Sequence, residues 1–359
     1  MGNRTIVPFG PQHPVLPEPI HLDLVLEDET VIEAIPRIGY VHRGLEKLVE
    51  KRDFQQYTYV AERICGICSF MHGMGYCMSI ESIMGAEIPD RAKFLRTIWA
   101  EFSRLHSHLM WLGLLADAFG FESLFMQSWK LREEVLDVFE ETTGGRVIFS
   151  VCDIGGVRKD IKQETLEKIL GVLDRMEKEL TEIAGVFLND STVKLRTRGV
   201  GKLSKEAAFE LGALGPMARA SGIEMDMRTQ GYAAYSQLDF KPIIDLEGDS
   251  YARTKVRLLE MFQAMDLIRQ CIAKIPEGDI KVKVTGSPKG EYFTRLEQPR
   301  GEVLYYVKAN GTKFLDRVRV RTPTFANVPA LLETLKNCSL ADVPILILTI
   351  DPCISCTER

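Results

Sequence analysis

The chain has 359 residues, of which 45% are hydrophobic and 26% are charged, and its net charge at pH 7 is −5. That length and composition suffice for a sizeable hydrophobic core, and the acidic balance argues against a nucleic-acid binder, which normally carries a basic stripe. The opening residues lack the apolar core of a secretory signal, and no charge-free apolar run reaches the roughly 18 residues of a transmembrane helix.

The first part of the chain predicts strands and the middle part predicts helices. Short β-branched runs around an acidic turn make residues 1–40 β-rich. Apolar residues then recur at three- and four-residue steps, which is the spacing of an amphipathic helix. This pattern predicts long helices at 91–119, 131–145, 160–187 and 253–275.

Strand signals return after residue 275. We expect a hairpin over 302–322, with its turn at Asn310–Gly311. A short helix is predicted at 328–338 and a buried strand at 344–350. The fold class is therefore α+β and mainly helical. We expect one domain, with a β-rich segment at 1–40, a central long-helix bundle within 41–275 and a β-rich segment at 276–359.

The eight cysteines fall into two groups. In a chain without an export signal, they indicate reduced thiols or metal ligands rather than a disulfide framework. Four are isolated and are predicted to be small buried side chains: Cys77, Cys152, Cys271 and Cys338. The other four form C-x-x-C pairs in "RICGICSFMH" and "DPCISCTER": Cys65, Cys68, Cys353 and Cys356.

Two such pairs supply four thiolates, a soft donor set that suits zinc, an iron–sulfur cluster, or nickel and iron. The pairs stand at opposite ends of the chain, whereas a zinc ribbon keeps them about 15–20 residues apart. A single site would therefore tie the two chain ends together. Structural zinc stays open as an alternative, while a thioredoxin-like dithiol lacks its usual βαβ context.

Both cysteine motifs resemble those of the large, catalytic subunit of NiFe hydrogenases. The resemblance extends over nearly the whole chain through "GPQHPVLPEP", "IPRIGYVHRGLEKLVE", "RTIWAEFSRLHSHLMWLG", "GPMARASGIEMDMR" and "PRGEVLYYVKANG". These segments are similar to membrane-bound, energy-converting (Ech-type, group 4) hydrogenases, which are related to the quinone-site subunit of respiratory complex I. Complex I subunits share several of these patterns but lack the four cysteines. A metal-free quinone or coupling subunit is the main alternative function.

The resemblance implies a metal centre and the groups that handle charge around it. Nickel would be held by all four paired cysteines, with the second cysteine of each pair bridging to an iron that carries carbon monoxide and cyanide. Glu46 in "HRGLEK" matches the family's proton-transfer glutamate, although residue type alone suggests a salt bridge to Lys47 or Arg43. Arg300 in "QPRGE" matches an arginine over the metals, where Asp351 would pair with it.

Further positions match residues that tune the centre. His72 resembles the histidine that hydrogen-bonds a bridging thiolate, and Pro323 with Thr324 resembles the segment that contacts a cyanide ligand. His106 and His108, within the long helix, are predicted to be core residues.

The resemblance also implies an additional ion and several partners. Many members of the superfamily end the second motif with a histidine that supports a magnesium or iron ion near the C-terminus. Arg359 occupies that position here, and Glu18 is the candidate ligand. The implied reaction is reversible H2 oxidation coupled to ferredoxin and ion translocation. The implied partners are a small subunit with a 4Fe-4S cluster, further iron–sulfur subunits and integral membrane subunits, at the cytoplasmic face of the cell membrane.

Overall fold

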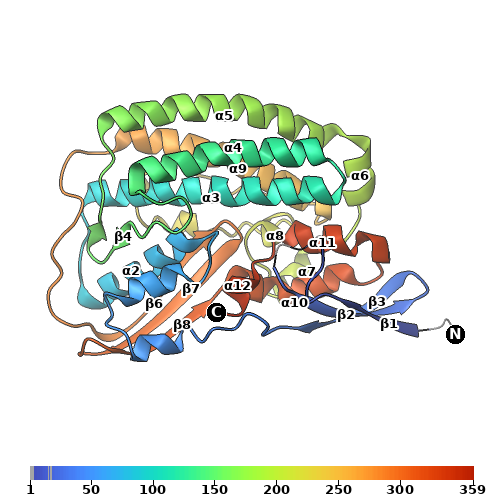
Figure 1. The fold of residues 1–359 in the computed structure, drawn as a ribbon, viewed down its shortest axis with the longest axis horizontal. Coiled ribbons are helices and arrows are strands. Elements are labelled where there is room, and N and C mark those ends of the chain that lie inside the picture. Colours follow the sequence, from blue (N-terminus) through green and yellow to red (C-terminus); the bar gives the residue numbers. More distant parts are fainter. Residues whose placement is uncertain (1–3, 15, 17) are drawn as a thin grey trace.

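The computed structural model describes residues 4–14, 16 and 18–359, and a bundle of long helices forms one side of the molecule (Figure 1). The long helices are α3 (Asp90–Ala118), α4 (Glu122–Thr143), α5 (Gln163–Asn189) and α9 (Ser250–Lys274). Helix α3 packs against both α4 and α9, so most of its side chains are buried. All four helices were predicted from periodicity, and the mainly helical α+β class is confirmed.

Helix α4 begins earlier than its sequence pattern indicates. The predicted start was residue 131, but the helix begins at Glu122. The additional turns pack onto α3 at Gly113, where a Cβ atom would come within 2.4 Å of the Trp129 ring. The contact between Trp129 on α4 and Gly113 on α3 stabilises these first turns of α4. Local periodicity does not reveal such a contact.

The N-terminal residues form an antiparallel sheet that packs against helices from the other end of the chain. Its strands are β1 (Arg4–Phe9), β2 (His21–Glu27) and β3 (Thr30–Arg37), in that order. Leu22, Leu24 and Leu26 alternate along β2 and share a core with Leu331 and Ile347. This core joins the two ends of the sequence. Residues 1–3, which also fall in the predicted β-rich region, lie outside the described residues.

A second antiparallel sheet packs against α2 (Ser69–Met84). Its strands are β6 (Lys289–Gln298), β7 (Gly301–Asn310) and β8 (Leu315–Arg321). Gln298 pairs with Gly301, so Pro299 and Arg300 form the tight turn between β6 and β7. The predicted hairpin is confirmed as β7–β8. Its connection is longer than a two-residue Asn-Gly turn, because β7 ends at Asn310 and β8 begins only at Leu315. Within it, the backbone N–H of Thr312 donates to the Asn310 side chain (2.9 Å).

The predicted strand at 344–350 is wrong, because this segment is helix α11 (Val343–Ile350). A short run of apolar residues buried on all sides has the same pattern in a strand and in a core helix. Pro344 in the first turn favours the helix. Asp351 ends the helix in the left-handed region (φ 55°), which directs the chain into the second cysteine motif.

Shorter elements connect these layers. The remaining α-helices are α1 (Tyr57–Glu62), α6 (Ser191–Thr197), α7 (Lys205–Glu210), α8 (Gly215–Arg219), α10 (Pro323–Leu335) and α12 (Ile354–Thr357). The 3-10 helices are η1 (Lys47–Glu50), η2 (Met227–Gln230), η3 (Tyr235–Gln237) and η4 (Leu340–Asp342), and β4 (Cys152–Asp153) pairs with β5 (Gly156–Val157). Across the described residues, no helix combines the length and apolar character needed to cross a membrane.

Candidate metal centre

The four paired cysteines, far apart in sequence, meet in the interior of the protein. The Sγ atoms of Cys65 and Cys353 are 3.3 Å apart, and those of Cys68 and Cys356 are also 3.3 Å apart. None of the four side chains is more than 2% exposed. The sulfurs of Cys65, Cys68 and Cys356 lie within 4.8 Å of one another, and the described part of the chain contains no other group of three or more Cys, His, Asp and Glu side chains close enough to hold a metal.

Backbone N–H groups orient the first cysteine of each pair. The loop between α1 and α2 directs the N–H groups of Ile67 (3.2 Å) and Cys68 (3.4 Å) at the sulfur of Cys65. In the loop between α11 and α12, the N–H of Cys356 donates to the sulfur of Cys353 (3.4 Å). Such donors favour an anionic sulfur. Cys356 lowers the pKa of Cys353, but the hydrogen bonds of Cys353 with Cys65 and Cys68 and its burial raise that pKa well above its usual range. A metal that binds here would therefore displace protons from the site.

The protonation of the four sulfurs indicates what would complete the site. Burial raises the pKa of the Cys68 thiol, but hydrogen bonds from Cys353, Cys356 and Cys65 outweigh burial and hold that pKa well below its usual range. The pKa of Cys356 is well above its usual range, first because of burial and then because of its sulfur neighbours. Four adjacent thiolates repel one another, and a bound cation would remove that cost. The donor set therefore fits a soft metal centre.

A histidine and a tyrosine support the second cysteine pair. His72 lies with Nε2 3.3 Å from the sulfur of Cys356 and with Nδ1 2.6 Å from the hydroxyl of Tyr305. Burial raises the pKa of Tyr305 well above its usual value, so the hydroxyl keeps its proton and can donate to Nδ1. Nε2 then carries the ring proton and donates to the sulfur. The contact predicted for His72 is present.

Arg300 and Asp351 form a buried ion pair beside the thiols. The guanidinium donates from Nη2 to Asp351 Oδ1 (2.7 Å), from Nε to the Asp351 carbonyl (2.7 Å) and from Nη1 to the Ser107 hydroxyl (3.0 Å). Burial lowers the pKa of Arg300, but Asp351 and the nearby cysteines raise it above its ordinary value. Asp351 Oδ2 is buried without a partner among the described residues. An unpartnered buried oxygen marks a place where a further group belongs.

The start of α10 holds the second cysteine loop. The N–H of Cys353 donates to the hydroxyl of Thr324 (3.1 Å), and the hydroxyl of Thr322 donates to the carbonyl of Cys356 (3.0 Å). Pro323 is buried in the first turn of this helix, between the two threonines. The predicted Pro323–Thr324 segment therefore lies against the site.

Glu46 is linked to the site through Arg359, and its observed partners differ from those that residue type alone suggests. Its carboxylate accepts from Arg359 Nε (3.0 Å), Arg319 Nη1 (3.2 Å) and the N–H of Val320 (2.9 Å). Lys47 pairs instead with Glu50. Arg359 in turn donates to the carbonyl of Cys356 (3.4 Å).

Arg43 connects the two cysteine loops, a role that sequence reasoning did not assign to it. Its guanidinium donates to the carbonyls of Arg63 (2.9 Å), Ile64 (2.7 Å) and Ser355 (3.3 Å). Arg43 belongs to the same "HRGLEK" motif as Glu46, which was the available signal. Tyr305 was likewise missed, although it lies in the "PRGEVLYY" motif.

Glu18 caps the second loop rather than facing an open site. Its carboxylate accepts from the N–H groups of Ile354 and Ser355 and from the Ser355 hydroxyl (2.6 Å). These donors suit an anion acceptor. Both carboxylate oxygens of Glu18 are thus hydrogen-bonded to the second cysteine loop.

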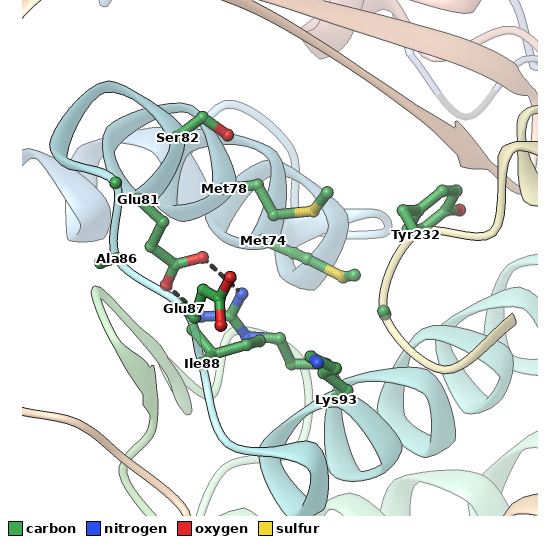
Figure 2. A pocket seen from close by; sticks show the side chains of 12 residues that line it. Met74, Met78, Glu81, Ser82, Ala86, Glu87, Ile88, Lys93 and Tyr232 are labelled. Atoms are coloured by element: carbon green, nitrogen blue, oxygen red, sulfur yellow. Dashed lines mark hydrogen bonds and ion pairs between the residues drawn. The ribbon is translucent and has the colours of Figure 1, made fainter. Parts of the chain in front are cut away.

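A surface cavity of about 520 Å³ lies beside α2 (Figure 2). Met74 and Met78 extend toward Tyr232 in this view, and the cavity lining includes Glu81 and Arg96. Those two side chains form a buried ion pair (2.6 Å), and Arg96 also donates to backbone carbonyls of the β4–β5 hairpin. The lining includes none of the paired cysteines, so the cavity is not part of this site.

Two family models match different parts of the chain. Residues 43–117 match the nickel-dependent hydrogenases, and residues 118–287 and 282–359 match the 49 Kd subunit of the respiratory-chain NADH dehydrogenase. Together these two matches define the class of the protein, a large subunit shared by nickel hydrogenases and respiratory complexes.

Full-length relatives agree with this class. The chain is 39% identical to the carbon monoxide-induced hydrogenase of Rhodospirillum rubrum, over 98% of this chain and 99% of that protein. It is 38% identical to the membrane-bound hydrogenase subunit alpha of Pyrococcus furiosus, over 98% of this chain and 87% of that protein. A solved chain of the membrane-bound sulfane sulfur reductase, an archaeal respiratory membrane complex, matches with a TM-score of 0.95 at 31% identity and 99% coverage of both chains. The chain therefore belongs to the family of group 4 membrane-bound hydrogenase subunits and their complex I relatives.

Proposed function

We propose that this chain is the catalytic subunit of a membrane-bound NiFe hydrogenase that interconverts H2 with protons and electrons. The observation that carries the proposal is the convergence of four buried thiols from the two ends of the chain. A coupling subunit that binds no metal has no need for such a donor set.

The residues present would fit a nickel–iron centre. Cys65, Cys68, Cys353 and Cys356 would hold the nickel and iron through their four sulfurs. When bound, that centre supplies the redox chemistry that splits H2.

The surrounding side chains would adjust charge and shape at the thiols. Arg300 keeps a fixed positive charge beside them, because Asp351 and Ser107 hold its planar fork. His72 donates to the sulfur of Cys356 and so withdraws electron density from it. Thr324 fixes the backbone at Cys353, and Pro323 stiffens the start of α10.

Glu46 would transfer the proton. A carboxylate can accept and release a proton, and Glu46 is linked to the second cysteine loop through Arg359. Its side chain is only 16% exposed, so it lies between the interior and the solvent.

Electrons would leave this chain for a partner. Its remaining cysteines are all buried, and the described residues contain no second set of cysteines suited to a cluster. We therefore propose a small subunit with a 4Fe-4S cluster, further iron–sulfur and integral membrane subunits, and ferredoxin as the redox partner. The complex would couple the reaction to ion translocation, with this chain as a peripheral subunit on the cytoplasmic face.

A metal-free quinone or coupling subunit is the second candidate function. It is favoured by the match of residues 118–287 and 282–359 to the complex I 49 Kd subunit. Elemental analysis of the purified complex decides between the two candidates. Nickel together with iron-bound carbon monoxide and cyanide bands in the infrared spectrum supports the hydrogenase. Absence of metal from this subunit supports the coupling subunit, and zinc alone would overturn both in favour of a structural site.

Cysteine variants provide the matching prediction. Replacing any one of Cys65, Cys68, Cys353 and Cys356 by Ser should abolish nickel binding and H2 activity, since a hydroxyl is a poor soft donor. Cys271→Ser and Cys338→Ser are the controls and should keep nickel near the wild-type amount. Loss of nickel from a control, with retention in a paired variant, would contradict the ligand assignment.

A further inference from the structure

A second buried carboxyl group lies next to the first cysteine loop. Glu62 is the last residue of α1 and is 1% exposed. One of its carboxyl oxygens accepts a hydrogen bond from the hydroxyl of Ser150, while Oε1 has no partner among the described residues. A buried carboxylate with an unpartnered oxygen is costly unless it takes up a proton or binds water.

The unpartnered oxygen faces the helix that carries His72. A Cβ atom at Gly73 would lie 2.7 Å from both Cγ and Oε1 of Glu62, so the carboxyl packs directly on the backbone of α2. The preceding residue, His72, contacts the sulfur of Cys356. The Glu62 carboxyl, which belongs to α1, therefore packs on α2 at the position next to the residue that supports the thiols.

Ser150 lies between Glu62 and the surface. It is only half-buried, and its backbone has the left-handed φ of 47°, which is unusual for a residue other than glycine. The neighbouring residue Val147 accepts a hydrogen bond from the Ser69 hydroxyl (2.9 Å), which fixes this loop over the first cysteine motif. A serine hydroxyl can accept one proton while it donates another.

We propose that Glu62 and Ser150 form a proton path between the thiol site and solvent, in addition to Glu46; this inference rests on the proposed hydrogenase function. A proton from the site is taken up at Glu62 Oε1. The carboxylic acid then rotates so that its protonated oxygen faces Ser150 and passes that proton to the hydroxyl oxygen, while the hydroxyl releases its own proton to water. The reverse sequence delivers one proton inward, so each passage moves one proton and leaves both residues unchanged.

The charge environment suits this role. Burial raises the pKa of Glu62 to about 7, against the hydrogen bond from Ser150 and the positive charges of Arg158 and Arg63, which lower it. Asp153 raises it further. A carboxyl group that titrates near neutrality can both accept and release protons at physiological pH. Glu46 has a separate set of contacts on β8 and with Arg359, so the two carboxylates do not share one hydrogen-bond chain.

The test uses the intact complex, with each variant made in the Glu46→Gln background so that only the second path is measured. The variants are Glu62→Gln, Glu62→Asp, Ser150→Ala and the control Ser128→Ala, which removes a hydroxyl on α4 that donates to the carbonyl of Leu124 (2.8 Å) and belongs to neither proton carrier. Adding Glu62→Gln should leave nickel and iron bound while the remaining H/D exchange slows at least about tenfold. Ser150→Ala should slow the remaining exchange less, Glu62→Asp should restore part of it, and Ser128→Ala should match Glu46→Gln alone.

An infrared pH titration supplies a readout that is independent of turnover. Wild type should show a protonated carboxylic-acid band that disappears near pH 7, is absent from Glu62→Gln and is shifted in Ser150→Ala. Lack of that band in wild type, or exchange in the Glu46→Gln, Glu62→Gln double variant within about twofold of Glu46→Gln alone with full metal, would overturn the proton path. Absence of nickel and of exchange from the wild-type complex would instead overturn the proposed hydrogenase function, and the path with it.

Discussion

At the scale of single residues, Arg300 shows how a side chain near the thiols depends on its geometry. Its three donors reach Asp351 and Ser107 in one planar arrangement. Lysine would keep the charge but could not make these contacts at once. Arg300→Lys should therefore lower H2 turnover by about 10- to 100-fold with nickel and iron still bound. Activity assays with metal analysis on the same preparation test this.

Arg295→Lys is the matched control for that substitution. Arg295 lies on β6, its side chain is 50% exposed, and it pairs with Glu302. Its replacement should leave turnover near wild type. Equal losses in the two variants would mean that Arg300 acts through the hairpin's stability rather than at the site.

Glu46 distinguishes proton transfer from a simple ion pair. Gln has nearly the same shape but does not titrate, so Glu46→Gln should retain metal and lose most H/D exchange. Arg319→Gln breaks one of the ion pairs and leaves the carboxylate in place. Because Arg319 is 59% exposed, that variant should cost at most about 1 kcal/mol of unfolding free energy and exchange normally. Normal exchange in Glu46→Gln would exclude it as the relay.

At the scale of elements, the β6–β7 turn that carries Arg300 is held by the start of α8. A Cβ atom at Gly215 (φ 61°) would lie 2.4 Å from the Cα of Gly301, which is backbone and cannot rotate away. Gly215→Ala should displace the turn, destabilise the protein by about 1–3 kcal/mol beyond the strain of positive φ, and lower turnover. Thermal unfolding and activity measurements on the same variant test both effects.

Gly212→Ala separates steric crowding from backbone strain. Gly212 has nearly the same φ of 66°, but nothing lies within 4 Å of the position that its Cβ would occupy. This control should show only the cost of placing alanine at positive φ, about 1–2 kcal/mol, with unchanged turnover. Similar behaviour in the two variants would show that the contact between α8 and the turn does not position Arg300.

The sequence was sufficient to predict elements with a clear period, but not contacts between distant segments. The long helices have an apolar stripe that repeats along the chain, and their prediction is confirmed. The segment 344–350 has no polar face, so nothing in it distinguishes a strand from α11. Arg43 and Tyr305 form hydrogen bonds with residues far along the chain, which the local sequence does not reveal. The available signal was the position of each residue in a family motif, "HRGLEK" for Arg43 and "PRGEVLYY" for Tyr305.

At the scale of the whole molecule, buried charges connect the long helices to the second sheet. The network contains three guanidinium groups, four carboxyl groups and one imidazole, all nearly inaccessible. Its members are Arg104, Arg219, Arg228, Glu101, Asp226, Glu260, Glu297 and His108. Burial lowers the pKa of His108, so that ring is neutral at pH 7. The carboxyl groups then exceed the guanidinium groups by one, and one retained proton balances the charge.

Of the four carboxyl groups, Glu297 alone has a pKa above its usual value, since those of Glu101, Asp226 and Glu260 are lowered, and this gives the molecule a predictable pH dependence. Burial, and then the charge of Asp226, raise the pKa of Glu297 from 4.5 to about 7. Between these values the unfolded chain loses the proton and the folded chain keeps it. The free energy of unfolding should therefore fall as pH rises from 4.5 to 7, by at most about 3 kcal/mol from this group, and change little above that range.

Glu297→Gln should flatten this decline in the free energy of unfolding, measured by urea unfolding between pH 4.5 and 8. Glu333→Gln, which alters an exposed pair with Lys336, should leave it unchanged. A decline that is equally steep in Glu297→Gln would place the buried proton on another member of the network.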